Sequence, residues 1–424
     1  MASPLDLNNI QGDILKGFPK KTETFYFFRI DDNRVKEFRE QLTELVPLIT
    51  TTNQIKDDRR KIDENKKKGA ERQHGPPKLL KMCGVGLSFS HKGLEKIGIR
   101  DDIGDANFKD GMLADAKDLG DQGSFSSDKF DPDWIPEFKE EIHGLIQVAG
   151  DCHDTVKDKL EEIKDIFSVG DDDATIHKVF RVTGDIRPGA HKGHEHFGFL
   201  DGISDPAVQG VDTNPLPGQE TIRQGIILLG REGDEFNRPP WAVDGSFLAF
   251  RYLPQRVPEF NAFLKNNAIP IPDPSKPPEL GMELLGARLV GRWKSGAPVD
   301  ISPLGDDKAL AKDPNRRNDF RYDPLSQERC PFAAHIRKTN PRSDLDSTEA
   351  NRIIRRGIQY GPEVSAAEAA TKRTTKDRGL LFACYQSNIA NGFKFIQQSW
   401  ANRVDFPFGK PIDPGFDPII GPNQ

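Results

Sequence analysis

Cysteine is scarce in this chain, and long apolar runs are missing from it. The four cysteines among 424 residues stand at positions 83, 152, 330 and 384, and no two of them form a C-x-x-C pair. This spacing excludes a zinc ribbon or a thioredoxin-type site, and the number is too small for a disulfide-stapled scaffold. No stretch approaches the roughly 20 apolar residues that a membrane-spanning helix needs, so we expect no membrane partner.

An excess of positive charge is also missing. The chain carries 60 Lys and Arg against 66 Asp and Glu, a net charge of −6 at pH 7, without a long basic face. Nucleic acid is therefore not an expected partner. Residues 1–7 lack the basic-then-apolar pattern of a signal peptide, and no Asn-x-Ser/Thr glycosylation site occurs. Taken alone, these two absences favour an intracellular location.

Phenylalanine, in contrast, is abundant. The sequence has 27 Phe beside 5 Tyr and 4 Trp, which suits either thick hydrophobic cores or a cavity lined by aromatic rings. Its length is sufficient for two domains, each with a sizeable core.

An internal repeat indicates how those domains are organised. Residues 28–42 align without gaps on residues 250–264, with seven of fifteen positions identical. In both copies an aromatic-rich strand, at 25–30 and at 247–252, runs into an amphipathic helix. The helical face of the first copy has apolar residues at i, i+3, i+7 and i+10.

Further strand-then-helix units occur at 83–97, 144–167 and 379–396. Such units, present in both halves, predict two α+β domains, each an antiparallel sheet with helices on one side. We place these domains at 1–185 and 186–424. Two segments read as solvated loops, the mixed-charge residues 56–74 and the proline-rich residues 270–278.

One acidic residue is flanked by glycines in an otherwise apolar run. Asp201 follows Gly198 by three residues and precedes Gly202 within EHFGFLDGIS. Glycines at both ends let the backbone turn sharply and let a flat or bulky group approach closely. A carboxylate held in such surroundings is a candidate catalyst, and the alternative is an ordinary acidic turn.

Two cationic segments further along are also candidates. His335 follows small apolar residues and precedes Arg337, Lys338 and Arg342. One imidazole nitrogen could bind a metal, and the arginines could hold an anionic group, although a histidine at a helix end is the alternative. Arg355 lies between two isoleucines and a glycine turn, where a helix C-terminus would also accommodate cations.

These three segments, in this order, resemble the dye-decolorising peroxidase family, especially its fungal members. The resemblance extends to LNNIQGDIL at 7–15, GLLFACYQS at 379–387 and FIQQSWAN at 395–402, and so covers nearly the whole chain. It implies two ferredoxin-like domains in a duplicated arrangement, with one haem b per chain bound in the C-terminal half, and a monomer or homodimer. Members of the fungal type are often exported, so the resemblance and the missing leader point in opposite directions on location.

The resemblance also implies a role for individual residues. His335 would be the axial ligand of the haem iron, Asp201 the acid/base on the other side, and Arg355 its partner. The further residues expected around the cofactor are Leu380 and Phe382 as apolar lining, Arg337 and Arg342 as propionate partners, and Asp417 as the acceptor for the His335 imidazole.

The implied reaction uses hydrogen peroxide to oxidise bulky dyes and phenolic or lignin-type compounds through an oxoferryl intermediate. Because an unperturbed aspartate has a pKa of about 3.9, a catalytic aspartate predicts an acidic pH optimum. Bulky substrates cannot enter a pocket sized for peroxide, so surface aromatics would carry electrons. Tyr360, five residues after Arg355, matches the family's candidate for this relay, and buried packing is its alternative role.

Three other functions compete with this one. His191, His194 and His196 beside Glu195 could suggest a zinc hydrolase, although H-x-x-H-x-H is not a helix-based zinc signature. A haem-binding or iron-releasing protein on the same scaffold would need neither Asp201 nor Arg355. A non-catalytic interaction protein with the same fold would bind no chromophore.

Overall fold

The computed structural model describes residues 4–71 and 80–422. Its first sheet has the strand order β2-β5-β1-β6, with all neighbours antiparallel. These strands are β1 (Thr22–Ile30), β2 (Cys83–Phe89), β5 (Gly144–Gly150) and β6 (Ile176–Asp185). Numbered along the chain the order is 2-3-1-4, which is the ferredoxin-like arrangement predicted for this half.

The second sheet repeats the first three strands of that order. Strand β12 (Gly379–Gln386) lies in the middle and pairs with β9 (Phe247–Pro254) on one side. On its other side it pairs with β10 (Ile354–Arg355) and then β11 (Ile358–Tyr360). The sequence repeat is therefore confirmed: β1 leads into α2 (Val35–Leu45) as β9 leads into α8 (Val257–Asn266).

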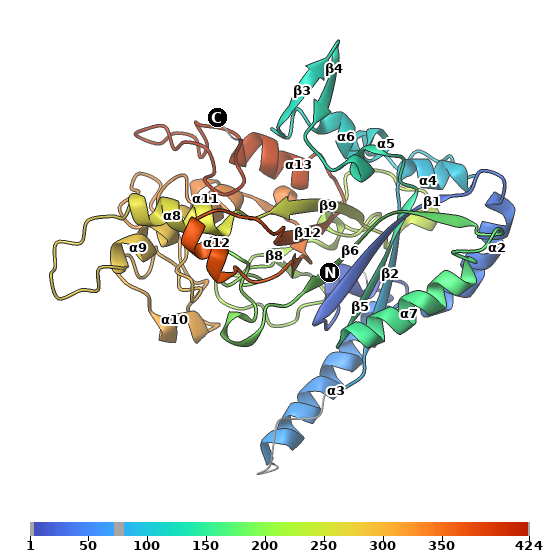
Figure 1. Ribbon diagram of the computed structural model, residues 1–424, viewed down its shortest axis with the longest axis horizontal. Helices are drawn as coiled ribbons and strands as arrows, with labels where there is room; N and C mark the ends of the chain where they lie inside the picture. The colour runs from blue at the N-terminus through green and yellow to red at the C-terminus, as the bar shows by residue number, and fades with distance from the viewer. Residues whose placement is uncertain (1–3, 72–79, 423–424) are drawn as a thin grey trace.

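The two sheets pack face to face. Phe25 and Phe27 of β1 meet Ile358, Leu381 and Phe250 of the second sheet in one apolar cluster. Helices α2 and α7 (His153–Ile166) cover the other face of the first sheet, and the cluster there includes Phe28, Phe38 and Leu160 (Figure 1). Strand β1 is thus buried on both faces along almost its whole length, polar Thr22, Glu23 and Thr24 included.

The remaining helices and hairpins surround this double layer. The shorter helices are α1 (Gly12–Leu15), α4 (His91–Lys96), α5 (Ala106–Asp110), α6 (Met112–Asp115), α9 (Leu280–Val290), α10 (Lys308–Lys312), α11 (His335–Thr339), α12 (Ala366–Thr371) and α13 (Phe393–Phe395), the last continuing into the π-helical turn η8 (Ile396–Ala401). Two short strand pairs, β3 (Gly123–Ser126) with β4 (Lys129–Pro132) and β7 (Ala207–Val208) with β8 (Thr221–Ile222), lie outside the main sheets.

The predicted loop at 56–74 is wrong over most of its length. Helix α3 (Thr52–Glu71) occupies it and projects away from the body of the molecule (Figure 1), while residues 72–79 lie outside the described part. Its charges, read as a sign of loop structure, lie three residues apart and form the pairs Asp57–Arg60, Asp58–Lys61 and Asp63–Lys66. Such pairs support a helix that has little apolar surface.

Candidate active site

Asp201 lies in a tight turn in the long connection after β6. Gly198 and Gly202 have φ of +98° and +70°, conformations that residues with a Cβ rarely adopt. The Gly202 N–H donates to Asp201 Oδ1 at 2.6 Å, and the Asp201 N–H donates to the Gly193 carbonyl at 3.0 Å. The glycines therefore do what the motif predicted: they fold the backbone so that it holds one carboxylate in place.

Arg355 approaches the same carboxylate from the second sheet. It stands on β10 opposite Cys384 of β12, and its Nη1 donates to Asp201 Oδ1 at 2.7 Å. Asp205 lies on the other side of the guanidinium, with 4.0 Å from its carboxylate to Arg355 Nε, and also pairs with Arg356 at 3.0 Å. The sequence reasoning missed Asp205, although it follows Asp201 by only four residues.

Charge, rather than burial, decides the protonation of this pair. Burial acts to raise the pKa of Asp201, but the charge of Arg355 and the hydrogen bonds from Gly202 and Arg355 outweigh it, so the pKa lies below its usual value. The charge of Asp201 in turn raises the pKa of Arg355. The site thus presents a partly accessible ion pair whose carboxyl group stays ionised in mild acid.

His335 begins α11 and is held by a carboxylate behind it. Its Nδ1 lies 2.8 Å from Asp417 Oδ2, while Asp417 Oδ1 accepts from the N–H groups of Ile419 and Ile420 at 2.8 and 3.0 Å. Burial lowers the pKa of His335, but the adjacent Asp417 more than compensates, so the pKa is raised. Within the described residues, His335 Nε2 has no hydrogen-bond partner.

The imidazole and the ion pair belong to one site. The charges of Asp201 and Arg355 both act on the pKa of His335, and the charge of His335 acts on that of Asp201. Although all three lie deep in the protein, 27% of the His335 side chain, 31% of Asp201 and 34% of Arg355 stay accessible. Three residues that lie far apart in sequence are therefore close enough to interact, and each keeps accessible surface.

Two apolar residues of β12 lie on the Arg355 side of the second sheet. Side chains alternate along a strand, so Leu380 and Phe382 share a face with Cys384, the residue opposite Arg355. The ring of Phe382 packs against Phe393 at 6.0 Å between centroids. Both residues are half-buried.

Arg337 does not fit the role predicted for it. Its guanidinium is 1% exposed and donates to both carboxylate oxygens of Asp344, and to the carbonyls of Asp323, Ser326 and Cys330. These bonds occupy all five of its N–H groups. Arg337 thus crosslinks these loops inside the protein, and its N–H groups all have protein partners.

Arg342 is placed differently. Its Nη1 donates to the carbonyls of Asn318 and Phe320 at 2.9 and 3.3 Å, and its guanidinium lies 4.0 Å from the centre of the Phe320 ring. Arg292 and Arg317 lie beside it, and burial lowers the pKa of Arg292 to about 10. Among the described residues none of these three arginines forms an ion pair, and Arg317 Nε has no hydrogen-bond partner.

Tyr360 faces the opposite side of the second sheet, in the cluster between the sheets. Its ring stacks on that of Tyr252 with 4.5 Å between centroids, and its hydroxyl donates to Asp377 Oδ1 at 2.8 Å. The sequence reasoning missed Tyr252 and Asp377. In the internal repeat, however, Tyr252 aligns with Ile30, so an aromatic residue replacing an aliphatic one was a visible signal.

The histidine cluster at 191–196 does not form a metal site. His196 Nε2 lies 2.8 Å from the Tyr360 carbonyl, whereas His194 Nδ1 lies 3.2 Å from the Lys192 carbonyl. Glu195 accepts from the N–H groups of Phe197 and Phe199. No group of three His, Cys, Asp or Glu side chains able to hold a metal ion is found in the part of the chain that the structure describes.

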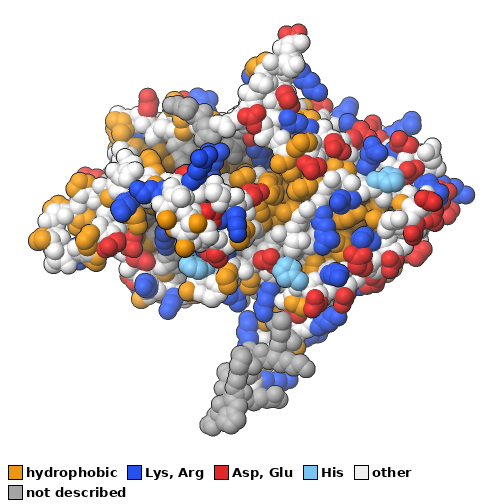
Figure 2. Space-filling model, in the orientation of Figure 1, with side chains coloured by type: hydrophobic (Ala, Val, Ile, Leu, Met, Phe, Trp, Pro, Cys, Tyr) orange, Lys and Arg blue, Asp and Glu red, His pale blue; other side chains and the backbone are white. Residues whose placement is uncertain are grey.

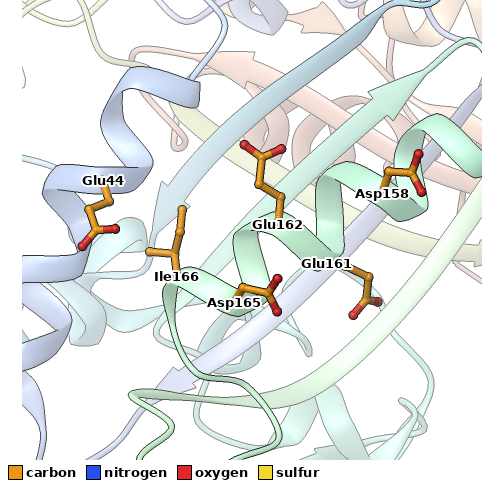
Figure 3. Close-up of a pocket in the computed structure, with 6 residues that line it drawn as sticks. All are labelled: Glu44, Asp158, Glu161, Glu162, Asp165 and Ile166. Atoms are coloured by element: carbon orange, nitrogen blue, oxygen red, sulfur yellow. The ribbon is translucent and has the colours of Figure 1, made fainter.

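Other parts of the surface carry acidic or mixed charges and do not indicate a particular ligand. A hollow beside α7 is lined mainly by carboxylates, some of which point into it and some away (Figure 3); its residues are Glu44, Asp158, Glu161, Glu162, Asp165 and Ile166. On the face shown in Figure 2, basic and acidic side chains are intermingled. Among the described helices, none is both long and apolar enough to cross a membrane.

Comparison with known proteins identifies the class. The family model "DyP dimeric alpha+beta barrel domain" matches residues 9–188, and "Dyp-type peroxidase, C-terminal" matches residues 288–405. A dye-decolorizing peroxidase of Mycena epipterygia is 46% identical over 436 residues, covering 98% of this chain and 76% of the relative.

Solved structures agree. A mutant of the dye-decolorizing peroxidase from Pleurotus ostreatus is 51% identical, with a TM-score of 0.94 over 99% of this chain and 90% of that one. A dye-decolorizing peroxidase in complex with 2,6-dimethoxyphenol is 45% identical, with a TM-score of 0.86 over 99% and 90% of the two chains.

This chain therefore belongs to the DyP-type peroxidase family, a class of hydrogen-peroxide-dependent oxidoreductases. Within the family it is of the fungal type, as the resemblance of its motifs predicted. Peroxidases of this family are haem enzymes.

Proposed function

We propose that this protein is a haem b peroxidase, with one haem per chain in a C-terminal domain of residues 186–424 and an N-terminal domain of residues 1–185. It uses hydrogen peroxide to oxidise bulky dyes and phenolic or lignin-type compounds. The observation that carries the proposal is an accessible imidazole with a free nitrogen that interacts with an accessible carboxylate–guanidinium pair.

The chemistry of these residues fits a haem. An axial imidazole needs one free nitrogen for iron and an acceptor for the other, and His335 with Asp417 supplies both. The haem propionates need cations that are not already neutralised, and Arg342 meets this requirement within the described residues. Leu380 and Phe382 supply apolar surface on the side of Arg355 and Asp201.

The haem supplies the redox chemistry when bound, accepting the oxidising equivalents of peroxide. Asp201 transfers the proton. Its carboxylate removes the proton from one peroxide oxygen and donates it to the other oxygen as the O–O bond breaks. Arg355 keeps Asp201 ionised and stabilises negative charge on the departing oxygen. Arg355 cannot accept a proton at any working pH, so Asp201 is the base.

The state of Asp201 predicts an acidic pH optimum. The pKa of this carboxyl group lies below its usual value, so the base remains ionised where a histidine in the same position would be protonated. Substrates too large for the space beside Asp201 are oxidised at the protein surface, with Tyr360 carrying the electron. Its position in the cluster between the sheets, next to a half-buried tyrosine, supports this role.

Peroxide titration of the purified holoenzyme tests the proposal. We expect a haem absorption spectrum that changes on addition of peroxide, and in Asp201→Asn a change slower by about 10²–10⁴-fold. Asp212→Asn is the matched control, because that carboxylate also pairs with a cation at 2.7 Å and is similarly exposed, at 30%. His335→Ala should lose the haem.

Two results would contradict the proposal. A colourless protein from cells with ample haem would exclude the haem site, as would normal haem retention in His335→Ala. If Asp201→Asn and Arg355→Leu both reacted with peroxide as fast as the wild type, the haem-binding or iron-releasing alternative would be favoured.

A further inference from the structure

Tyr360 forms part of a three-residue unit. Its ring stacks on that of Tyr252 with 4.5 Å between centroids and 28° between planes. The two tyrosines come from β11 and β9, the strands on either side of β12, where they lie opposite Gly379 and Leu381. The sheet therefore fixes the two rings next to each other, independently of any loop.

One carboxylate joins the two hydroxyl groups. Tyr360 donates to Asp377 Oδ1 at 2.8 Å, and Tyr252 donates to Asp377 Oδ2. Each phenol thus has its own acceptor oxygen on the same side chain. A stacked pair that needed only packing would not require this connection.

Solvent exposure increases from Tyr360 through Tyr252 to Asp377. Tyr360 is 4% exposed, Tyr252 is half-buried, and Asp377 is exposed. Tyr252 packs on its inner side against Phe180 of β6 at 6.0 Å between centroids. The sequence of contacts therefore leads from the cluster between the sheets to solvent through Tyr252.

We propose that Tyr252 is the outer tyrosine at which bulky phenolic reductants are oxidised, and that Asp377 carries the protons between Tyr360 and Tyr252. This inference rests on the proposed function, because the oxidising equivalent comes from the reaction of the enzyme with peroxide. Tyr252 contacts the reductant and is a catalytic residue; Asp377 acts through the two tyrosines and is a positioning and proton-carrying residue.

The steps balance in electrons and protons. Tyr360 loses an electron to the oxidised enzyme while its O–H bond breaks and the proton passes to Asp377 Oδ1, leaving a neutral phenoxyl radical. Tyr252 then gives an electron to that radical and its own proton to Oδ2, while Oδ1 returns its proton to Tyr360. Finally a phenolic reductant gives Tyr252 an electron and a proton and leaves as a phenoxyl radical, and the exposed Asp377 releases the proton on Oδ2 to solvent, which restores its carboxylate.

The environment favours coupled loss of the proton. Burial, with the Asp377 hydrogen bond, raises the pKa of Tyr252 to about 12, and burial raises that of Tyr360 further. Both phenols are therefore protonated at every working pH. An oxidised phenol is a strong acid, so a base already hydrogen-bonded to it makes removal of the electron easier.

Three variants and one control test the inference. Tyr252→Phe keeps the stacked ring without the hydroxyl, Asp377→Asn keeps the shape without the base, and Tyr360→Phe removes the inner member. Tyr26→Phe is the control, because Tyr26 is also buried in a sheet but belongs to the cluster on the other face of β1. Thermal unfolding of each variant shows whether the fold is intact.

Two readouts are needed. The first is dye turnover, normalised to the amount of enzyme that reacts with peroxide. The second is the tyrosyl radical signal in electron paramagnetic resonance, recorded after peroxide and also after flash oxidation by a dissolved tris(bipyridine)ruthenium oxidant, which does not depend on the peroxide reaction. We expect dye turnover to fall about tenfold in Tyr252→Phe and in Asp377→Asn. The radical signal should fall in Asp377→Asn under both oxidants, whereas in Tyr252→Phe it should fall after flash oxidation and persist on Tyr360 after peroxide. Neither readout should change in Tyr26→Phe.

The outcomes distinguish the two proposals. If Tyr360→Phe leaves dye turnover unchanged, the relay in the proposed function is wrong and this inference fails with it. If Tyr360→Phe lowers turnover but folded Tyr252→Phe or Asp377→Asn matches the wild type in both readouts, only this inference is overturned. A fall in turnover explained entirely by lost stability would overturn it too.

Discussion

At the residue scale, the pKa of Asp201 depends on two opposing effects. Burial raises it, and Arg355, at 2.7 Å, lowers it by charge and by hydrogen bond. Removing the arginine leaves burial opposed mainly by the hydrogen bond from Gly202. The carboxylate would then take up a proton at higher pH and cease to act as a base there.

We therefore predict that Arg355→Leu moves the acid limb of the pH–rate profile for the peroxide reaction to higher pH. The rate itself should fall by about 10²–10³-fold, because a group stabilising the transition state is lost. The measurement is the rate of spectral change after mixing with peroxide. Arg231→Leu, which breaks a different arginine–aspartate pair, is the control; an acid limb that stays in place would show that Arg355 does not set this pKa.

A second prediction concerns Asp417. Its carboxylate holds the Nδ1 side of His335, which fixes the ring orientation and makes the imidazole a stronger ligand. Asp417→Asn should retain the fold but release haem to an acceptor protein about 10–100-fold more readily. Haem transfer to apomyoglobin measures this, and an unchanged transfer rate would rule out the supporting role.

Arg337 and Arg342 show what could not be predicted from single residues. Arg337 and Arg342 looked equivalent in sequence, as cations just after His335. Only the fold shows that Arg337 meets Asp344 and three carbonyls, while Arg342 retains unpaired charge among the described residues. The difference lies in hydrogen-bond partners 7 to 24 residues away, in loops whose course no local pattern predicts.

At the scale of elements, a buried lysine attaches α11 to the C-terminal segment. Lys338 Nζ donates to the carbonyls of Arg403, Phe406 and Gly415 at 2.6, 2.6 and 2.8 Å, and the residue is fully buried. The same segment continues to Asp417. Lys338 thus connects α11, which carries His335, with the C-terminal segment that carries Asp417, the hydrogen-bond partner of His335.

We predict that Lys338→Met lowers the free energy of unfolding by about 3 kcal/mol, because it leaves three buried carbonyls without a donor. Chemical denaturation of the haem-free and haem-loaded protein measures the change. Lys66→Met on the exposed side of α3 should change it by less than about 0.5 kcal/mol. Equal effects for the two variants would contradict the connection.

Elements differed in how well the sequence predicted them. The repeat at 28–42 and 250–264 correctly gave a strand followed by a helix twice, since periodicity reports directly which face is buried. Helix α3 was missed because its stability comes from ion pairs and helix propensity, and it has almost no apolar stripe. Hydrophobic periodicity cannot detect such a helix.

At the scale of the whole molecule, a buried carboxyl group lies where the N-terminal segment meets both sheets. Glu23 of β1 is fully buried beside Lys20 and near Asp13, and Asp13 accepts a hydrogen bond from Tyr385 of β12. Burial raises the pKa of Glu23 to about 7, against the lowering effect of Lys20. Folding therefore tightens the binding of a proton at this position.

The sign of the resulting pH dependence follows from linkage. Between about pH 4.5 and 7 the native state holds a proton that the unfolded state has lost, so the free energy of unfolding falls as pH rises through that window. We predict that the difference in stability between wild type and Glu23→Gln declines across it. Urea unfolding at several pH values measures this, with Glu44→Gln as an exposed control; a difference independent of pH would contradict the raised pKa.

By itself the sequence determined the two α+β halves and the strand-to-helix repeat, and it singled out Asp201, His335 and Arg355, which the structure brings close together. These are local properties, which periodicity and short motifs report directly. Only the tertiary structure decided which cations stay unpaired, and that Tyr252 and Asp377 join Tyr360. The physical reason is that hydrogen bonding, stacking and burial depend on contacts between separate segments, from 7 residues apart for Arg337 and Asp344 to 125 for Tyr252 and Asp377, and these contacts exist only once the chain has folded.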